Sequence, residues 1–539
     1  MLGSLTQLDW TIICAYLAGI MGFAIWLSRG QNSREDYYVG ARRVGPWPVA
    51  LSIMATQCST NSILGAPAFV AFAAGGGLVW LQYELALPLA MIFLILFVMP
   101  LFRHLKLVSI YEYLELRFDL RTRLVLSGLF LFIRAFATAV TVYSIALVID
   151  LITGVGFFWS VMLLGTFTVV YDIFGGIRGV IYSDVIQLLI LVMVLILLLV
   201  LLTDSAGGFT ALLNDFDPQR RQAIDLSHHG FGDGQTFAFW PMLVGGFFLY
   251  VSYYGCDQSQ VQRSLSTEGI DQTNQALFLN GLLRFPLVAL YCLVGVGIAV
   301  LAADSPDFLQ LIPTNDGTPE YNLAVPVYML MALPAGLVGL AMVALFAAAM
   351  SSLDSVINSL SATTMEDFVR RFSSRQRTDR EELMLSRWLT VFWGVVTLSM
   401  SFFVGDIAPT VLEAINKIGS LANGPILAVF MLGFFVKRVN GPLATFGLLL
   451  GIAVNGVLWI AAPAVSWLWW NPIGFTVAFL IPVVMSFVAE DMTKKDFPTM
   501  RVNFGSAGAL ANAGALNWQV RSVFLVLWCG LLCGGLVML

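Results

Sequence analysis

The sequence contains little charge. Only 11% of its 539 residues are Asp, Glu, Lys or Arg, whereas soluble globular domains carry about 25%. Hydrophobic residues make up 58% of the chain, and long apolar runs recur from one end to the other. Runs of about 18 or more apolar residues are typical of helices that cross a bilayer. The composition excludes an ordinary soluble protein and predicts an all-α polytopic membrane protein.

Other features are scarce or missing. The six cysteines all fall in apolar stretches and form no C-x-x-C pair, so we expect neither a disulfide framework nor a zinc site. No stretch has the Lys and strand context of a phosphate-binding loop, so ATP-driven pumping would need another subunit. The three histidines lie in loops, away from any intramembrane serine. We therefore expect no enzyme and no catalytic residue, although an aspartate protease using Asp184 and Asp354 stays formally open.

Fourteen membrane spans are predicted. They lie at residues 7–28, 46–73, 76–102, 124–151, 156–175, 180–203, 237–258, 276–302, 325–365, 386–405, 410–435, 443–462, 466–488 and 519–539. The ninth is longer than a bilayer requires, which leaves room for a separate short helix before Pro334.

The placement of Lys and Arg gives the orientation, because cytoplasmic loops are enriched in them. With the N-terminus outside, most of the 28 Lys and Arg residues fall in cytoplasmic loops or helix ends, Arg263 among them. Arg220 and Arg221 lie outside. We predict a multi-pass protein of the cell membrane, plasma or inner, with its N-terminus outside.

The ninth span carries an unusual polar stripe in FAAAMSSLDSVINSL, residues 346–360. A charged side chain inside a bilayer costs roughly 2.5–3.5 kcal/mol on insertion scales, so Asp354 needs a reason to be there. Together with neighbouring hydroxyls it supplies hard oxygen ligands, which suit an alkali cation better than a transition metal. The plainer alternative is that the serines bond back to carbonyls one turn earlier.

The second span is polar at its centre, ATQCSTNS, and Gly65 and Pro67 follow. Such a helix is expected to break in mid-membrane, where irregular backbone is tolerated only beside a cavity. The seventh span is weakened similarly at Gly245 and Gly246. If spans 2–6 and 7–11 are two halves, each begins with an interrupted helix. Five helices per half then make the halves inverted, as in secondary transporters.

Four stretches resemble the sodium:solute symporter family: GGIRGVIYSDVIQ, YGCDQSQVQRSLS, AAAMSSLDSVINSLSATTMEDF and AINKIGSLANGPILAVFMLGFFVKR. The resemblance implies the leucine-transporter-type fold, a 5+5 inverted repeat, with one extra N-terminal and three extra C-terminal helices. The implied parts are residues 1–45, 46–203, 237–435 and 436–539. YEYLELRF and SLSATTMEDF look most like the monocarboxylate, multivitamin and iodide branch of the family.

The resemblance also implies where sodium binds. The common site would use the carbonyls of Ala55, Cys58 and Ala348 and the hydroxyls of Ser351 and Ser352. Some members have a second sodium site, which maps here to Asp184, Asp354 and Ser355. Those members have Ser at position 354, so Asp354 either strengthens that site or replaces it by holding a proton or a structural partner. Na⁺ is the one cofactor expected.

The residues predicted to bind the substrate have polar, charged or aromatic side chains. They are Gln57, Ser59, Ser62, Tyr83, Glu84, Arg134, Tyr253, Arg284 and Asn416. Arg134 is suited to a bidentate bond with a substrate carboxylate; the alternative is a salt bridge to Asp184 or Glu84. Tyr83, Glu84 and Asn416 fall where the sugar branch binds its substrate, and Arg284 where that branch has a Lys.

We therefore expect a sodium-coupled symporter that imports a small organic anion by alternating access. The alternatives are a sodium-coupled sugar or polyol symporter, a proton-coupled symporter and, less favoured, a channel. The expected partners are the solute, sodium ions and the lipid bilayer, with no nucleic acid. A monomer suffices, and the oligomeric state is left open.

Overall fold

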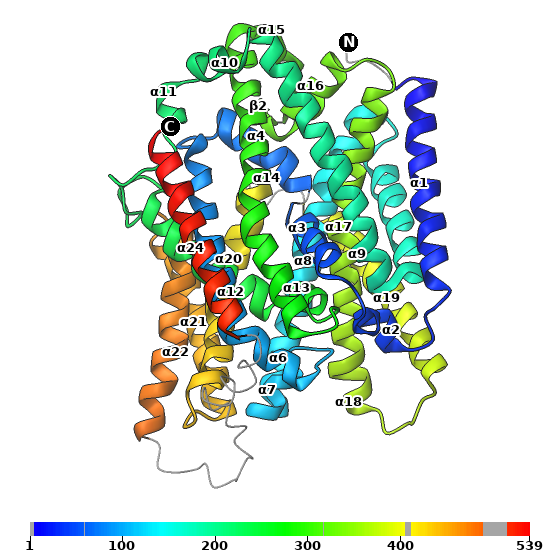
Figure 1. The fold of residues 1–539 in the computed structure, drawn as a ribbon, viewed down its shortest axis with the longest axis vertical. Coiled ribbons are helices and arrows are strands. Elements are labelled where there is room, and N and C mark those ends of the chain that lie inside the picture. The colour runs from blue at the N-terminus through cyan, green and yellow to red at the C-terminus, as the bar shows by residue number, and fades with distance from the viewer. Residues whose placement is uncertain (1–4, 59, 316, 405–410, 489–514) are drawn as a thin grey trace.

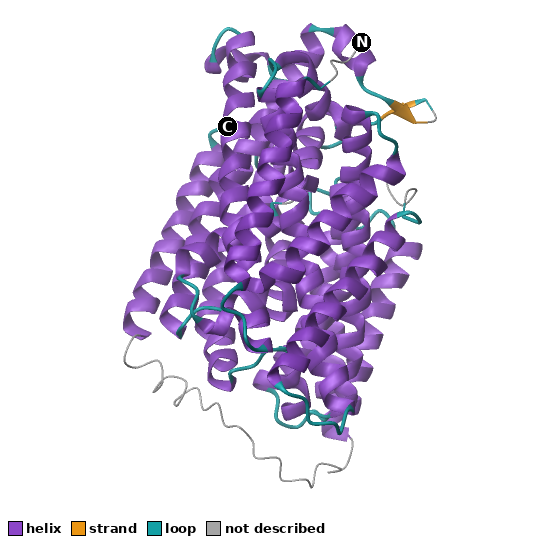
Figure 2. Ribbon diagram, turned by 90° about the vertical axis from the view of Figure 1, so that its right-hand side faces the viewer, coloured by secondary structure: helices purple, strands orange, loops and turns teal. Residues whose placement is uncertain are grey.

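A computed structural model of the chain describes residues 5–539 except 59, 316, 405–410 and 489–514. Its described part is helical apart from a two-stranded antiparallel hairpin, β1 (Thr314–Asn315) and β2 (Thr318–Pro319) (Figure 2). Most long helices run along the long axis of the molecule (Figure 1). Within those residues, 11 helices are long and apolar enough to cross a membrane. The prediction of an all-helical polytopic protein is confirmed; the count of fourteen spans stays a prediction.

Most long helices coincide with an expected span. They are α1 (Gln7–Ser28), α8 (Leu120–Thr153), α14 (Ile270–Asp304), α17 (Leu337–Thr363), α19 (Asp379–Ser401), α20 (Val411–Phe435), α21 (Gly441–Ala461), α22 (Trp470–Val488) and α24 (Ala515–Val537). The third span is continuous but irregular: η2 (Leu78–Leu85), α5 (Ala86–Phe93), η3 (Leu94–Val98) and α6 (Met99–Leu105). The short helix α16 (Ala324–Ala332) precedes Pro334 and is separate from α17, in the place that the length of the ninth span left for it.

The second span is interrupted, as its polar centre predicts. Helix α3 (Pro46–Gln57) ends at Cys58, whose φ of −83° and ψ of 60° are not helical, and α4 (Thr60–Phe72) follows. The Cys58 amide still donates to the Met54 carbonyl at 2.8 Å, so α3 is intact up to the break. Backbone groups near Cys58 therefore face neighbouring elements instead of continuing a helix.

The seventh span is also interrupted, but not at the glycine pair. Gly245 and Gly246 are helical, at the junction of η4 (Pro241–Gly245) and α12 (Gly246–Cys256). The break lies at Asp257, with φ −102° and ψ 122°, before α13 (Gln258–Ser264). The glycines serve close packing instead, because a Cβ on Gly245 would lie 2.3 Å from the Leu468 carbonyl oxygen.

Spans five and six form one continuous element, α9 (Phe157–Ser205), with a kink at Gly176. Gly176 has φ 53° and ψ −165°, a backbone conformation that strongly favours glycine. Space demands glycine as well, since a Cβ there would lie 2.8 Å from the Tyr37 ring. The kink falls at the predicted boundary between the fifth span, 156–175, and the sixth, 180–203.

Shorter elements connect the long ones. They are α2 (Arg34–Val39), η1 (Gly40–Arg42), α7 (Glu112–Arg117), α10 (Phe209–Asp215), α11 (Pro218–Arg221), α15 (Pro306–Leu311), η5 (Tyr321–Leu323), η6 (Thr364–Val369), α18 (Arg370–Phe372) and η7 (Trp467–Trp469).

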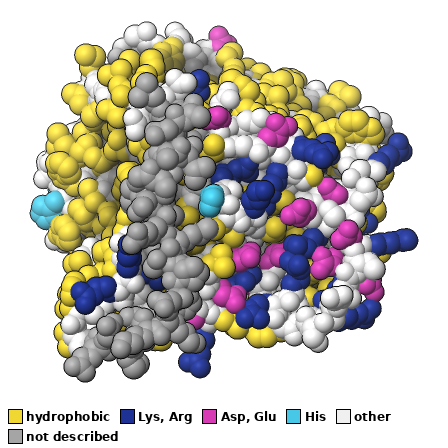
Figure 3. All heavy atoms as spheres, turned by 60° about the horizontal axis from the view of Figure 1, so that its bottom comes forward, with side chains coloured by type: hydrophobic (Ala, Val, Ile, Leu, Met, Phe, Trp, Pro, Cys, Tyr) yellow, Lys and Arg dark blue, Asp and Glu magenta, His cyan; other side chains and the backbone are white. Residues whose placement is uncertain are grey.

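Charged residues gather at the end of the molecule that carries α7 and α18, which lies at the bottom of Figure 1 and comes forward in Figure 3. Figure 3 shows Lys, Arg, Asp and Glu intermingled on this face, with hydrophobic side chains along its upper and left edges. Several form ion pairs here, including Arg123 with Asp367 at 2.5 Å and Arg34 with Glu382 at 2.8 Å. A charged end surrounded by apolar surface is what a membrane-embedded helix bundle requires.

Candidate sodium and substrate sites

The polar stripe of α17 faces the break that follows α3. The Ser351 hydroxyl donates to the Ala348 carbonyl at 3.1 Å and lies 3.5 Å from the Ala55 carbonyl oxygen. The Ser352 hydroxyl lies 3.2 Å from the Ala348 carbonyl oxygen and 3.4 Å from that of Thr56. The serines thus do both things that the sequence left open: they bond one turn back and they face the interrupted neighbour.

Four of the five residues predicted for the common sodium site meet here. They are Ala55, Ala348, Ser351 and Ser352. Cys58 lies at the break, and its thiol contacts the Arg284 guanidinium on the other side; its carbonyl stays a predicted ligand. The Thr56 carbonyl, which the sequence reading omits, lies beside Ser352 in the same turn as Ala55.

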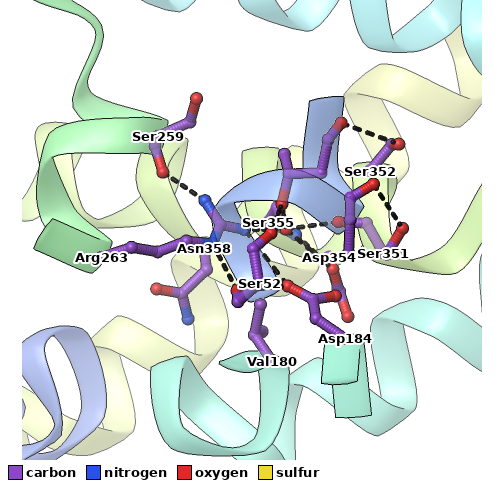
Figure 4. Close-up of polar contacts among 12 residues, drawn as sticks. Ser52, Val180, Asp184, Ser259, Arg263, Ser351, Ser352, Asp354, Ser355 and Asn358 are labelled. Carbon is purple, nitrogen blue, oxygen red and sulfur yellow. Dashed lines mark hydrogen bonds and ion pairs between the residues drawn. The ribbon is translucent and has the colours of Figure 1, made fainter. Parts of the chain in front are cut away.

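The residues predicted for a second site also meet. Figure 4 shows Asp184 of α9 next to Asp354 and Ser355 of α17, with Ser52 of α3 between the two helices. The Ser52 hydroxyl donates to Asp184 Oδ2 at 2.6 Å, and the Ser355 amide donates to Asp354 Oδ1 at 2.5 Å. Asp184 Oδ1 and Asp354 Oδ2 are buried and accept no hydrogen bond from any described residue. Two carboxylate oxygens are therefore available for a cation.

Arg263 lies in this cluster, not at a cytoplasmic helix end where its position in the sequence places it. Its side chain is fully buried. Nε donates to the Ser52 hydroxyl at 2.9 Å, while Nη2 contacts the Ser355 hydroxyl and lies 3.8 Å from Asp184 Oδ2 (Figure 4). The expectation fails because α13 begins after the break at Asp257 and lies inside the protein.

Asp172 of α9 is a further buried acid that the sequence reading misses. Its Oδ1 accepts a 3.3 Å bond from the Asn358 amide of α17, and its Oδ2 has no partner within the described part of the chain. The Asn358 side chain in turn accepts from Gln262 Nε2 at 2.9 Å. An acid inside a predicted apolar span is the signal in the sequence that could have identified Asp172. Asp172 is the third buried acid here, after Asp184 and Asp354, and it lies on the same helix as Asp184.

A cavity of about 200 Å³ adjoins the broken α3–α4 segment, and Thr56 and Ser352 belong to its lining. Eight of the nine predicted substrate residues line it: Gln57, Ser62, Tyr83, Glu84, Arg134, Tyr253, Arg284 and Asn416. The ninth, Ser59, lies outside the described residues. Side chains from several separate elements thus converge on one hollow, next to the hydroxyls of α17.

Glu84 and Arg284 form a buried pair in the cavity wall. Arg284 Nε lies 3.4 Å from Glu84 Oε2, and the Tyr250 hydroxyl donates to Glu84 Oε1 at 3.0 Å. Removing one partner of such a pair would strand an uncompensated buried charge. These residues therefore hold η2, α12 and α14 together at the cavity whether or not they also touch a solute.

Arg134 of α8 pairs with Asp257, not with Asp184 or Glu84, the partners considered from the sequence. The contact runs through Nε, and the guanidinium also lies over the Tyr253 ring, 4.8 Å from its centroid. Asp257 was not expected at the cavity because its role depends on the break between α12 and α13.

Two interrupted helices beside a polar cavity, with hard oxygen ligands at one interruption, are the architecture of a secondary transporter. The comparison with known families makes this specific. The chain belongs to the sodium:solute symporter family, whose model matches residues 37–451. It is therefore a sodium-coupled, multi-pass membrane transporter and not an enzyme.

Relatives within the family differ in what they are named for. The sodium/sialic acid symporter NanT of Aliivibrio fischeri is 29% identical over 507 residues, 94% of this chain and 97% of its own. The sodium-dependent multivitamin transporter of Oryctolagus cuniculus is 31% identical over 80% of this chain and 66% of its own. The human sodium/iodide cotransporter is 28% identical over 85% of this chain and 70% of its own. The predicted likeness to the multivitamin and iodide branch is confirmed. The chain is also similar to sialic acid symporters.

Solved structures agree on the fold. A Na⁺-coupled sialic acid symporter in a substrate-bound outward-open state matches with a TM-score of 0.79 at 25% identity, over 90% of this chain and 98% of that one. Mhp1, a nucleobase-cation-symport-1 family transporter, matches in a closed conformation with a TM-score of 0.55 at 15% identity, over 86% and 96%. The latter likeness concerns the fold alone. Together they support the leucine-transporter-type fold.

Proposed function

We propose that the protein imports a small organic acid of single negative charge, coupled to sodium, by alternating access. One observation carries the choice of an anion. Arg134 lines the cavity and is held through Nε by Asp257, while its two terminal nitrogens have no hydrogen-bond partner among the described residues. A guanidinium presented in this way suits bidentate binding of a carboxylate.

The rest of the cavity suits a substrate that also carries hydroxyl or amide groups. Gln57, Ser62, Tyr83 and Asn416 supply uncharged polar atoms to the lining. A carboxylated sugar acid uses both the arginine and these groups, and sialic acid, for which two relatives are named, belongs to that class. A simple monocarboxylate would use the arginine alone.

The proposed architecture is a 5+5 inverted repeat. Residues 46–203 and 237–435 form the halves, each led by an interrupted helix, and the remaining helices are additions at the two ends of the chain. In this scheme there are fourteen spans and the N-terminus is outside. The breaks at Cys58 and Asp257 support it, because they occupy corresponding positions in the two halves.

In the proposed cycle, one sodium ion binds Ala55, Cys58, Ala348, Ser351 and Ser352 and ties the α3–α4 break to α17. A second binds at Asp184, Asp354 and Ser355, where two carboxylate oxygens have no hydrogen-bond partner in the described part of the chain. Sodium favours the outward-open state only as far as it binds that state more tightly, and this difference is the coupling to the solute.

The test is uptake into proteoliposomes, screened over sugar acids, monocarboxylates, vitamins and neutral sugars, in sodium and in choline. We expect sodium-dependent uptake of an acid. Arg134→Gln should raise its half-saturation concentration by roughly 10- to 100-fold, because a hydrogen bond to a charged group contributes about 1.5–3 kcal/mol. Arg121→Gln, on the exposed start of α8, is the control. Uptake confined to neutral sugars, or an unchanged affinity in Arg134→Gln, would contradict the proposal.

A further inference from the structure

Asp257 occupies the break between α12 and α13 and uses both carboxylate oxygens. Oδ1 accepts the Ser259 amide at 2.9 Å and the Ser259 hydroxyl at 2.5 Å, which caps the start of α13. Oδ2 contacts Arg134 Nε from α8. One side chain thus fixes the start of a helix and also the arginine that faces the cavity.

A second contact holds the same arginine from the same segment. The Tyr253 ring of α12 lies beneath the guanidinium, and its hydroxyl accepts a 2.8 Å bond from Gln260 Nε2 of α13. Arg134 therefore contacts the break itself and the helix before it, while a residue of α13 holds Tyr253 in place. Because Nε bonds to Asp257 and the Tyr253 ring covers one face of the guanidinium, a solute would contact the terminal nitrogens of Arg134.

The charges in the cavity wall balance. Among its described lining residues, the carboxyl and guanidinium side chains are those of Glu84, Asp257, Arg134 and Arg284. Glu84 offsets Arg284, and Asp257 offsets Arg134. A bound monoanion then adds one negative charge, which a nearby sodium ion can compensate. A dianion would add a second charge in a largely buried site, where an uncompensated charge is costly.

We propose that Asp257 is a specificity-determining residue: it cancels part of the charge of Arg134, so that the cavity accepts acids with one negative charge and rejects those with two. The inference rests on the proposed function, since it presumes that Arg134 binds a carboxylate. It assigns to Asp257 a role in choosing the solute beyond capping α13.

The experiment measures dissociation constants by calorimetry on the purified full-length protein in sodium. The probes are two matched pairs, sialate with its doubly charged 9-carboxylate derivative and lactate with malate, plus the uncharged methyl ester of sialate. The variants are Asp257→Asn, which removes the charge, Asp257→Ser, which removes the charge but keeps a helix-capping side chain, and Asp257→Glu, which retains the charge.

We expect the wild type to prefer the monoanion of a pair. Asp257→Asn and Asp257→Ser should reduce that preference by roughly 15- to 270-fold, the effect of removing one charge at about 10 to 5 Å with an effective dielectric constant of about 20. Asp257→Glu should preserve it, and binding of the ester should change little. A purely structural role would instead weaken all probes alike.

The outcomes separate the two ideas. If the wild type binds neither sialate nor lactate and takes up only neutral solutes, the proposed function fails and this inference falls with it. If the wild type binds a monoanion and Arg134→Gln weakens it, but the preference over the dianion is unchanged in both neutral Asp257 variants, the inference alone is overturned.

Discussion

At the scale of single residues, the hydroxyl of Ser352 is the sharpest test of the common sodium site. It lies between the carbonyls of Ala348 and Thr56, on two different helices. Ser352→Ala removes one oxygen ligand, and a lost contact of about 1–2 kcal/mol corresponds to a rise of roughly 5- to 30-fold in the sodium concentration for half-maximal uptake. Uptake measured against sodium concentration checks this.

The control lies on the same helix. Ser359→Ala removes a hydroxyl whose hydrogen bonds to described residues all go to carbonyls of its own helix, Ser355 at 3.0 Å and Val356 at 2.9 Å. It should leave the sodium dependence near that of the wild type. If Ser352→Ala also retains the wild-type sodium dependence while the protein is folded in the membrane, the site is wrongly assigned.

Residue types were easier to predict than their partners. An acid and hydroxyls within an apolar span are visible in the sequence, and Asp184, Asp354 and Ser355 indeed lie together. The partners of the arginines are not visible, because they depend on how distant segments pack. Arg134 meets Asp257, 123 residues away, and Arg263 meets Ser52, 211 residues away. No local pattern specifies such pairs.

At the scale of elements, the kink of α9 depends on Gly176. Gly176→Ala should lower the thermal midpoint of the purified protein by several degrees. A side chain in this backbone conformation, which is essentially confined to glycine, costs about 1–3 kcal/mol, and the added Cβ would meet Tyr37 and Gln31 at 2.8 and 3.2 Å. Gly128→Ala is the matched control, since this helical position has open space and alanine favours helix.

Equal thermal midpoints for the two glycine variants would show that the kink is not required. A midpoint lowered in Gly176→Ala together with slower uptake would indicate that the bend positions Asp172 and Asp184, which lie on either side of it, toward α17.

The break in the second span was predicted, because polar residues and poor helix formers coincide there. The position of the break in the seventh span was not predicted, because a single residue, Asp257, marks it. The stretch ATQCSTNS predicted the interruption of the second span, and α3 ends within it. In the seventh span, the paired glycines predicted the weak point, but the break lies at Asp257. Glycine tolerates a break but does not require one, and here Gly245 and Gly246 admit the neighbouring Leu468 and Tyr83.

At the scale of the whole molecule, orientation follows from the distribution of Lys and Arg and stays a prediction. Single cysteines introduced as Ser227→Cys and Ser374→Cys, both at exposed positions, test it. With a membrane-impermeant maleimide on intact cells, Ser227→Cys should be labelled above the background of the parent chain. Ser374→Cys should be labelled only after permeabilisation. The reverse pattern would invert the topology.

The charge moved per cycle connects the sites to the driving force. Three acids, Asp172, Asp184 and Asp354, and one guanidinium, of Arg263, are fully buried together, so acidic groups outnumber basic ones there by two. That excess favours a second sodium ion. Two sodium ions with one monoanion move one net positive charge inward, and 100 mV then contributes about 2.3 kcal/mol to accumulation, roughly 50-fold.

Asp184→Asn removes one of those carboxylates while Arg263 stays, so the variant should bind a single sodium ion. Uptake by the wild type should rise with an inside-negative potassium diffusion potential and depend cooperatively on sodium. Uptake by the variant should not depend on the membrane potential, because one sodium ion and one monoanion carry no net charge. Its dependence on sodium concentration should also be non-cooperative, because only one sodium ion binds. A wild type whose uptake of a monoanion ignores the potential would limit the cycle to one sodium ion and leave Arg263 as the resident cation of the second site.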